Sequence, residues 1–360
     1  MTLQRLFLLT LGVLLGHFML AAQEHFNDPQ RPDWWNEPYP TTYTSPAAAQ
    51  DMDFIRVDGN RFVNEAGETM VFRGLSIADP DKVEKNGHWS KAHFAVIKSW
   101  GANLVRVPVH PTALRQRGLA AYLQLLDEAI DWCSELGMYV IIDWHSIGNL
   151  QMELFQHDIY NTTQRETLYF WKTIAARYRG VPTVAFYEIY NEPTDFNGTL
   201  GSCSWAEWKA IVEDIIDIIY AHDRQVIPLV AGFNWAYDLR EVNYQPIARE
   251  GVAYVTHPYP GKCLPPREVH WEEHFGFLAD RFPIVATEMG FYDEGEEHLI
   301  DDGTYPEAII NFLGEKGISW CAWVFDPNWV PQMIRNYEYE PTRQGAFFRE
   351  VMLRENGDSE

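Results

Sequence analysis

Apolar runs and amphipathic stretches alternate along most of this chain. The apolar runs are short, rich in branched and aromatic residues, and spaced roughly 26–45 residues apart. Eight of them are predicted to be strands, near residues 70–76, 103–109, 139–145, 183–191, 225–232, 252–259, 283–290 and 318–325. Several of the intervening stretches end in Gly, which is a helix stop signal. They predict helices near residues 90–101, 120–137, 163–180, 204–223 and 305–317.

This repeated unit sets the predicted fold class. Strands that are apolar throughout are typical of a parallel sheet covered by helices. Eight strand–helix units predict an α/β chain folded as a single-domain (β/α)8 TIM barrel. The alternative is an open doubly wound sheet, but its first turn usually carries a glycine-rich nucleotide motif, whereas this turn reads RGLSIADPDK. Before the first barrel strand, the sequence alternates around two turns and predicts a small β-hairpin.

The N-terminal segment differs from the rest of the chain. Residues 1–22 combine an Arg, an apolar run and two final Ala residues, which is the pattern of a secretory signal peptide. Residues 23–50 are rich in Pro, Asn and Thr and predict an extended or mobile lead-in. We therefore assign residues 51–354 to the barrel domain and residues 355–360 to a C-terminal tail. Export implies a secreted or periplasmic protein that has no membrane contact once the signal is removed.

The net charge narrows the range of partners. The formal charge is -23 at pH 7, and such a polyanion is a poor partner for nucleic acid or an anionic membrane. A neutral substrate fits this surface better.

The four cysteines do not form a metal-binding pattern. None of them has CxxC spacing. Cys133 and Cys321 fall in a predicted helix and a predicted strand, so we expect buried thiols. Cys203 and Cys263 lie in loops, and whether they form a disulfide stays open.

Polar and aromatic side chains gather at the ends of the predicted strands. In a (β/α)8 barrel the active site is built from the C-terminal ends of the strands. Six strands carry such residues near that end, which packing alone does not explain. These residues are Arg106, His145, Asn191, Glu192, His257, Tyr259, Glu288 and Trp323.

Two of these residues are carboxylates from distant parts of the chain. Glu192 follows the fourth strand and Glu288 follows the seventh, so we expect them nearly opposite each other across the barrel mouth. A carboxylate pair that spans a bond is the equipment for glycoside hydrolysis. A separation of ~5–5.5 Å gives retention of configuration, and ~6.5–9.5 Å gives inversion. The sequence predicts the pair but not its separation.

With these motifs the chain resembles glycoside hydrolase family 5. NEP follows the fourth strand and TEMG the seventh, and DWH, HPY, Arg106 and Trp323 occur in the family's order over roughly residues 54–350. The resemblance implies a retaining double displacement with Glu192 as acid/base and Glu288 as nucleophile. It implies neither a metal nor a cofactor.

The resemblance also implies roles for the neighbours of the nucleophile. Arg106 would keep the Glu288 carboxylate ionised, and Tyr259 would donate a hydrogen bond to it. Asn191 would bind the sugar 2-hydroxyl, a contact that strengthens in the transition state.

Further residues are expected to contact the sugar chain. His145 and His257 would bind sugar hydroxyls and the acid/base, and Trp323 would form the floor under the sugar at the cleavage point. Trp235 and Trp329 lie in loops at the same face and are candidates for additional sugar subsites.

The predicted function is a secreted, monomeric retaining glycosidase that acts on a plant-type polysaccharide. Endo-β-1,4-glucanase (cellulase) activity on a β-linked glucan is the first expectation. β-Mannanase, xyloglucanase and exo-β-glucosidase from the same family stay open. A non-catalytic glycan-binding barrel would lack a catalytic carboxylate. A metal-dependent barrel hydrolase would usually carry HxH on its first strand, where this chain has FRGLS.

Glu188 lies in the same apolar run as Glu192, four residues earlier. Side chains alternate along a strand, so both glutamates are expected to face the barrel interior at different depths. We interpret Glu188 as a structural residue neutralised by a buried partner, with Arg73 on the first strand as the candidate.

Overall fold

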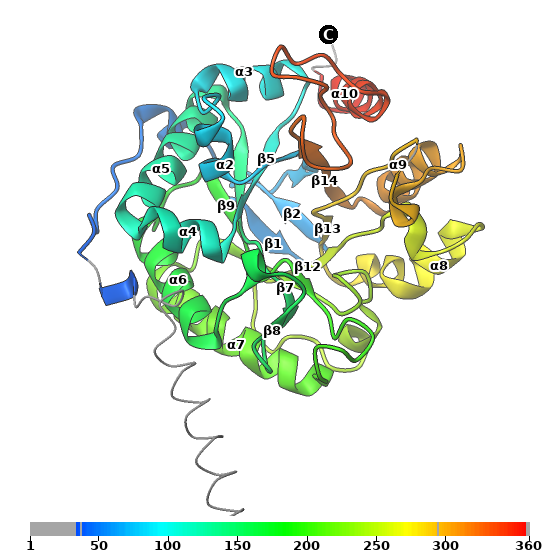
Figure 1. Cartoon of the computed structure of the whole chain (residues 1–360), viewed down its shortest axis with the longest axis horizontal. Coiled ribbons are helices and arrows are strands. Elements are labelled where there is room, and N and C mark those ends of the chain that lie inside the picture. Colours follow the sequence, from blue (N-terminus) through cyan, green and yellow to red (C-terminus); the bar gives the residue numbers. More distant parts are fainter. Residues whose placement is uncertain (1–33, 37, 294, 358–360) are drawn as a thin grey trace, which may run out of the picture.

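The protein is a closed eight-stranded parallel barrel surrounded by helices (Figure 1). The structure is a computed structural model that describes residues 34–36, 38–293 and 295–357. The strands follow one another around the barrel in chain order, and the last pairs with the first. They are β4 (Arg73–Ile77), β5 (Leu104–Val109), β6 (Tyr139–Trp144), β9 (Val184–Glu188), β11 (Ile227–Ala231), β12 (Ala253–Thr256), β13 (Ile284–Ala286) and β14 (Ser319–Phe325). The predicted (β/α)8 fold is confirmed.

Nine α-helices are present in the described residues, and they form the outer layer of the barrel. They are α2 (Pro80–Lys85), α3 (Lys91–Ser99), α4 (Pro111–Arg117), α5 (Leu119–Leu136), α6 (Gln164–Arg177), α7 (Trp205–His222), α8 (Arg267–His274), α9 (Tyr305–Lys316) and α10 (Arg343–Asn356). Four of them were not predicted, because α2 and α4 are short and α8 and α10 are rich in charged residues. Helix α10 also continues two residues past position 354, where the predicted barrel domain ends.

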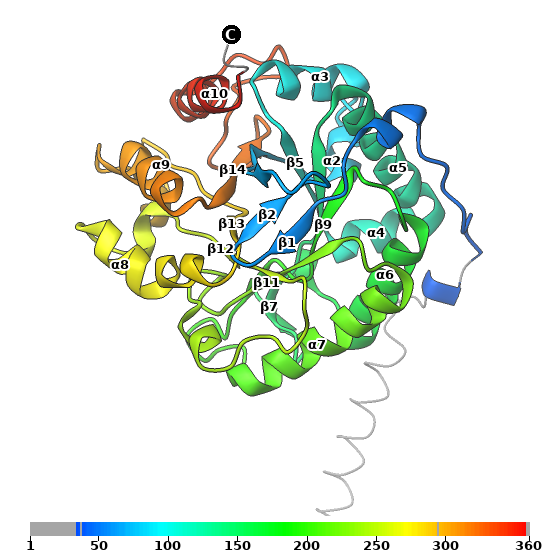
Figure 2. The ribbon, with the colours of Figure 1, turned by 180° about the vertical axis from the view of Figure 1, so that it is seen from behind.

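A small antiparallel sheet covers the N-terminal end of the barrel, as seen from behind in Figure 2. It consists of β1 (Arg56–Asp58), β2 (Arg61–Val63) and β3 (Thr69–Met70), so the predicted hairpin has a third strand. Phe62 of this sheet packs edge-to-face on Phe72 and Phe186, with ring centroids 5.9 and 5.1 Å away. These buried rings fill the barrel interior at this end.

A second small sheet lies at the C-terminal end of the barrel. It joins β10 (Glu192–Pro193), β7 (Ile147–Asn149) and β8 (Leu154–Phe155) in the order β10-β7-β8. Strands β7 and β8 form a hairpin in the loop after β6, and this hairpin faces the viewer in Figure 1.

The described part of the lead-in is packed against the barrel. Trp34 is buried, and its indole N–H donates to Glu166 of α6 at 2.7 Å. The Tyr43 hydroxyl donates to Asp131 of α5 at 2.6 Å. The entire predicted signal peptide, residues 1–22, and the first part of the lead-in lie outside the described residues. Within the described residues, no helix has the length and apolar character to span a membrane.

All four cysteines are free thiols. Cys133 and Cys321 are buried, as predicted. The structure does not contain the disulfide considered between Cys203 and Cys263. The Cys203 thiol instead lies 3.6 Å from the Ser204 carbonyl oxygen.

Candidate active site

The C-terminal mouth of the barrel opens into a cleft of about 780 Å³. Both candidate carboxylates, Glu192 and Glu288, line its base and are largely buried. The predicted aromatic residues Trp235, Trp323 and Trp329 line the same cleft. These residues therefore lie together at the C-terminal face, as expected for polar and aromatic residues at the ends of parallel barrel strands.

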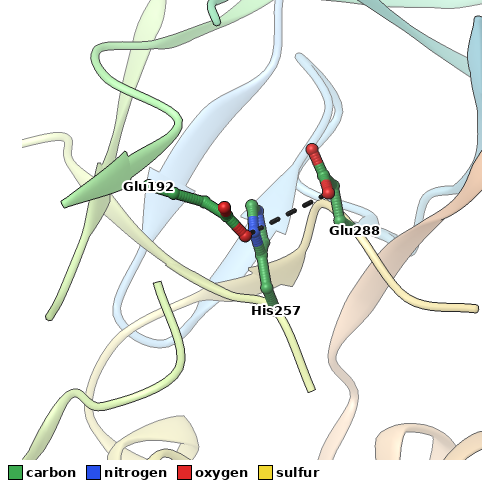
Figure 3. A group of neighbouring side chains, drawn as sticks. All are labelled: Glu192, His257 and Glu288. Carbon is green, nitrogen blue, oxygen red and sulfur yellow. Dashed lines mark hydrogen bonds and ion pairs between the residues drawn. The ribbon is translucent and has the colours of Figure 1, made fainter. Parts of the chain in front are cut away.

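Glu192 and Glu288 face each other with His257 between them (Figure 3). A carboxylate oxygen of each glutamate and a ring nitrogen of His257 all lie within 4.8 Å of one another. Nδ1 of His257 is 2.8 Å from Oε1 of Glu192 and 3.9 Å from Oε2 of Glu288. This short separation is typical of retaining enzymes, in which the nucleophilic carboxylate reaches the anomeric carbon directly and not through a water molecule.

Glu288 is held at both carboxylate oxygens. Nη1 of Arg106 donates to Oε1 at 2.8 Å, and the Tyr259 hydroxyl donates to Oε2 at 2.9 Å. Burial raises the pKa of Glu288 above its ordinary value, although His257 and Arg106 act in the opposite direction. Arg106 thus favours the ionised form of Glu288, which is the expected direction, but burial and the neighbouring carboxylates outweigh it.

Arg106 is fully buried and is the central cation of the site. Its guanidinium donates to Glu188 through Nε at 2.6 Å and through Nη2 at 3.1 Å. Nη2 also lies 2.9 Å from Oδ2 of Asp143. Burial alone would lower the pKa of Arg106, but Asp143, Glu188 and Glu288 raise it well above its ordinary value. One cation therefore faces three buried carboxyl groups.

The buried partner of Glu188 is Arg106, and the prediction of Arg73 is wrong. Glu188 is buried, as expected, but Arg73 lies on the outside of β4. Its guanidinium contacts Asn356 and Glu355 of α10, at 3.2 and 3.6 Å. Side chains alternate along a strand, so position 73 faces the helices, whereas Ser76 faces the interior and lies 3.5 Å from Arg106.

His257 connects Glu192 to Glu188. Burial lowers its pKa, but Glu288, Glu188 and Glu192 raise it to about 9, so the ring is a cation at neutral pH. Nδ1–H donates to Glu192, and Nε2–H donates to the Thr287 hydroxyl at 2.9 Å. Thr287 in turn donates to Glu188 at 2.8 Å. His257 thus bonds to the acid/base candidate, as predicted, and it is buried below the cleft.

The raised pKa of His257 predicts a loss of stability at alkaline pH. A group whose folded pKa lies above its unfolded value of ~6.5 stabilises the protein fully below that value and loses this effect as pH rises through the folded pKa. We expect the free energy of unfolding to fall by up to about 3 kcal/mol between pH 6.5 and pH 9.5 through this group. Urea unfolding at several pH values measures the slope.

The matched variant for this measurement is His257→Gln, which keeps hydrogen-bonding capacity but cannot titrate. Burial lowers the pKa of Lys262 to about 8, so this group changes stability in the opposite direction over part of the same range. Because Lys262 is present in both proteins, the difference between their slopes isolates His257. Equal slopes would contradict the prediction.

His145 supports the aromatic floor of the cleft. Its Nδ1 shares a hydrogen bond of 2.6 Å with Asp143, and its ring stacks on Trp323 with centroids 5.3 Å apart and planes 3° apart. Burial, together with the nearby cations, lowers the pKa of His145 well below its ordinary value, so the ring is neutral. Trp323 is 8% exposed, and its indole N–H donates to the Val330 carbonyl at 3.0 Å.

The two predicted subsite tryptophans line the same cleft as the carboxylate pair. Trp329 stacks on Trp323 with ring centroids 5.8 Å apart. Trp235 is bonded to the residue that follows Glu192, because its backbone N–H donates to the Pro193 carbonyl at 3.2 Å. Its indole N–H donates to Gln156 at 2.8 Å. The cleft that holds the carboxylate pair is therefore lined by several aromatic rings.

Other residues that line the cleft were not predicted. They include His110, Tyr160 and Lys262. His110 directly follows β5, so the strand-end rule would have found it. Tyr160 lies in the loop after β6 and Lys262 in the loop after β12, where no periodic signal marks a functional position.

One group of three side chains among the described residues has metal-ligand spacing, and it is Glu192, His257 and Glu288. Its chemistry does not fit a divalent cation. A metal needs a neutral imidazole with a free nitrogen, whereas both ring nitrogens of His257 are hydrogen-bonded and its pKa is raised to about 9. The Glu288 oxygens are also already bonded to Arg106 and Tyr259.

A (β/α)8 barrel with a close carboxylate pair at its C-terminal mouth defines the class of barrel glycoside hydrolases. The sequence model of "Cellulase (glycosyl hydrolase family 5)" matches residues 63–328, which is most of the chain. The chain belongs to this family.

Relatives of known structure and known name agree with this assignment. A crystal structure of a β-glucanase from Saccharophagus degradans in complex with cellotetraose is 45% identical, has a TM-score of 0.85, and covers 90% of this chain and 100% of that chain. Endoglucanase 5 of Pectobacterium carotovorum is 25% identical over 75% of this chain and 50% of its own length. An endoglucanase of Paenibacillus polymyxa is 22% identical over 81% of this chain and 84% of its own length. The chain thus spans about half the length of the first of these curated relatives.

Proposed function

We propose that this chain is an exported retaining endo-β-1,4-glucanase, with Glu192 as the acid/base and Glu288 as the nucleophile. The observation that carries the proposal is the short separation of the two carboxylates, whose nearest atoms lie within 4.8 Å together with His257. Retaining enzymes hold the pair ~5–5.5 Å apart so that one carboxylate reaches the anomeric carbon directly. Inverting enzymes need a wider gap for a water molecule.

The reaction proceeds in two steps. A Glu288 oxygen attacks the anomeric carbon, the bond to the leaving oxygen breaks, and that oxygen takes the proton from the Glu192 carboxyl group. Glu192, now a carboxylate, then removes a proton from a water molecule that attacks the same carbon and releases Glu288. His257 orients the Glu192 carboxyl group in both steps, because its Nδ1–H donates to Oε1 of that group at 2.8 Å.

Asn191 is oriented for the sugar 2-hydroxyl. Its Oδ1 accepts a hydrogen bond from Nη2 of Arg106 at 2.6 Å, which fixes the amide so that Nδ2 faces the site. Nδ2 is buried and has no protein partner. A buried donor without a partner costs free energy, and a substrate hydroxyl that accepts from it recovers that cost.

Two observations support an endo-acting glucanase. The cleft that holds the carboxylate pair is also lined by Trp235, Trp323 and Trp329, which offer stacking faces for several sugar units of a chain. The 45% identical relative is a β-glucanase solved with cellotetraose, a linear β-linked glucose oligomer. The N-terminal signal pattern supports export.

A substrate panel tests this proposal. Purified protein is assayed on β-1,4-glucan, mannan, xyloglucan and aryl β-glucosides, with and without a chelator. We expect fastest cleavage of β-1,4-glucan, products of mixed length at early times, and equal rates with the chelator. Release of a single short product from the start would favour an exo-acting enzyme, and faster mannan or xyloglucan cleavage would overturn the substrate assignment.

A further inference from the structure

Glu192 does not lie on a barrel strand. Barrel strand β9 ends at Glu188, and the N–H groups of Ile189 and Asn191 still donate to the carbonyls of Leu229 and Trp144 on the neighbouring barrel strands before Glu192 begins β10. Strand β10 pairs in parallel with β7, with Glu192 opposite Ile147 and Pro193 opposite Gly148. The backbone of the proposed acid/base therefore belongs to the small sheet made by the β7–β8 hairpin.

Backbone hydrogen bonds hold this segment on both edges. On the side of the hairpin, the N–H of Glu192 donates to the Ser146 carbonyl and the N–H of Thr194 donates to the Gly148 carbonyl, both at 3.1 Å. On the other side, the Pro193 carbonyl accepts from the N–H of Trp235 at 3.2 Å. Glu192 thus lies just past the end of the barrel ladder, where its strand partner is β7 of the hairpin in the same register that pairs β9 with β6.

Ser146 fixes the start of the hairpin. Its side chain is buried, and its hydroxyl donates to the Tyr160 carbonyl at 2.7 Å. The same hydroxyl lies 3.1 Å from the Tyr190 hydroxyl. The carbonyl that receives the Glu192 N–H is therefore itself tied to the walls of the cleft.

Gly148 fixes the distance between the two strands of the hairpin. Its φ of +151° is unfavourable for other residues, and a Cβ at this position would lie 2.5 Å from the Leu154 oxygen and 2.7 Å from the Phe155 Cα. Both neighbours belong to β8, so a side chain here would force β7 away from β8. Because the Gly148 carbonyl receives the Thr194 N–H, such a shift moves the Glu192 segment as well.

We propose that the β7–β8 hairpin is a positioning element for proton transfer by Glu192, and that Gly148 is the positioning residue within it. The proposal rests on the proposed acid/base role of Glu192. A general acid must lie within hydrogen-bond reach of the leaving oxygen, and a misplacement of ~1 Å costs about 10²-fold in rate. Glu288 follows a different strand and is bonded to Arg106 and Tyr259, so a shift of the hairpin leaves these contacts of the nucleophile in place.

The test compares Gly148→Ala with wild type on two aryl β-cellobiosides. Phenol is a poor leaving group that needs protonation, whereas 2,4-dinitrophenol leaves without it. We expect kcat/KM for the phenyl substrate to fall about 10²-fold, while kcat/KM for the dinitrophenyl substrate changes little. Azide attacks the glycosyl-enzyme without a general base, so it is expected to raise dinitrophenyl kcat in the variant and to give a glycosyl azide product.

Two variants separate this effect from a general loss of structure. Gly101→Ala also places a Cβ against backbone, 2.9 Å from Leu353 at the far end of the barrel, at a φ of +89°. We expect it to affect the two substrates equally. Ser146→Ala removes only hydroxyl contacts and is the milder variant should Gly148→Ala fail to fold. We expect the same difference between the two substrates in this variant, with a smaller fold-change in kcat/KM.

The reference is Glu192→Ala, which distinguishes the two proposals. If it lowers the rates for both substrates equally, the acid/base assignment fails. If Glu192→Ala shows the leaving-group dependence but the folded Gly148 and Ser146 variants lower both rates equally, only the positioning proposal is overturned. Retained azide rescue in these variants, together with the leaving-group dependence, supports it.

Discussion

Replacing Glu288 by Gln is expected to abolish turnover, with kcat falling about 10⁴-fold or more on every substrate that the wild type cleaves. The amide keeps the size of the carboxyl group but cannot form the glycosyl-enzyme bond. Burial raises the pKa of Glu288, which means that the folded state holds this charge at a cost. We therefore expect the Tm of the variant to equal or exceed that of the wild type.

A direct chemical measurement accompanies the kinetics. A 2-fluoro aryl β-cellobioside slows the second step, so the glycosyl-enzyme accumulates and mass spectrometry of peptides locates the bond. The label is expected on the peptide that contains Glu288 and to be absent from Glu288→Gln. Glu192→Ala, which retains the nucleophile, is the control and is expected to be labelled by an activated substrate. Near-normal turnover of Glu288→Gln would overturn the nucleophile assignment.

Replacing Arg106 by Met is expected to have the largest effect on stability. The guanidinium is fully buried and bonded to Glu188, Asp143 and Glu288, so its removal leaves several buried carboxyl groups without a counter-charge. Removal of one partner of a buried ion pair costs about 3–5 kcal/mol. We expect a loss of this size in urea unfolding at pH 7, together with loss of activity. The loss should shrink toward acid pH, where the carboxyl groups bind protons and no longer need the cation.

The matched control is Arg73→Met. Arg73 is half-buried on the outer side of the barrel and lies 3.6 Å from Glu355. Ion pairs with access to solvent contribute about 1 kcal/mol or less. A similar loss of stability in the two variants would contradict the assignment of Arg106 as the buried partner of Glu188.

The barrel and much of the candidate site could be predicted from local patterns. Each barrel strand is marked by a continuous apolar run, because strands buried on both faces need apolar side chains at every position. Parallel strands end at the same face of a barrel, so residues as distant in sequence as Glu192 and Glu288 could be placed at one mouth without coordinates. The same rule would have found His110, which follows Val109 of β5.

Other features depend on contacts that no local pattern records. The partner of Glu188 depends on which face of its strand each of Arg73 and Arg106 occupies. Side chains alternate along a strand, so an error of one residue in the predicted alignment assigns a side chain to the wrong face. Helices α8 and α10 were missed because their exposed surfaces leave few apolar positions to define a period. Tyr160 and Lys262 reach the cleft through loops whose paths are set by packing.

The sequence by itself determined the barrel, the face that carries the site and the two carboxylates that lie there, because periodicity and strand direction are local properties. Only the tertiary structure decided how these groups act together. It placed Arg106 among three carboxyl groups and His257 between Glu192 and Glu288. It also attached Glu192 to the β7–β8 hairpin. Distances and charges within the site arise from contacts between segments far apart in sequence, and these exist only once the barrel has closed.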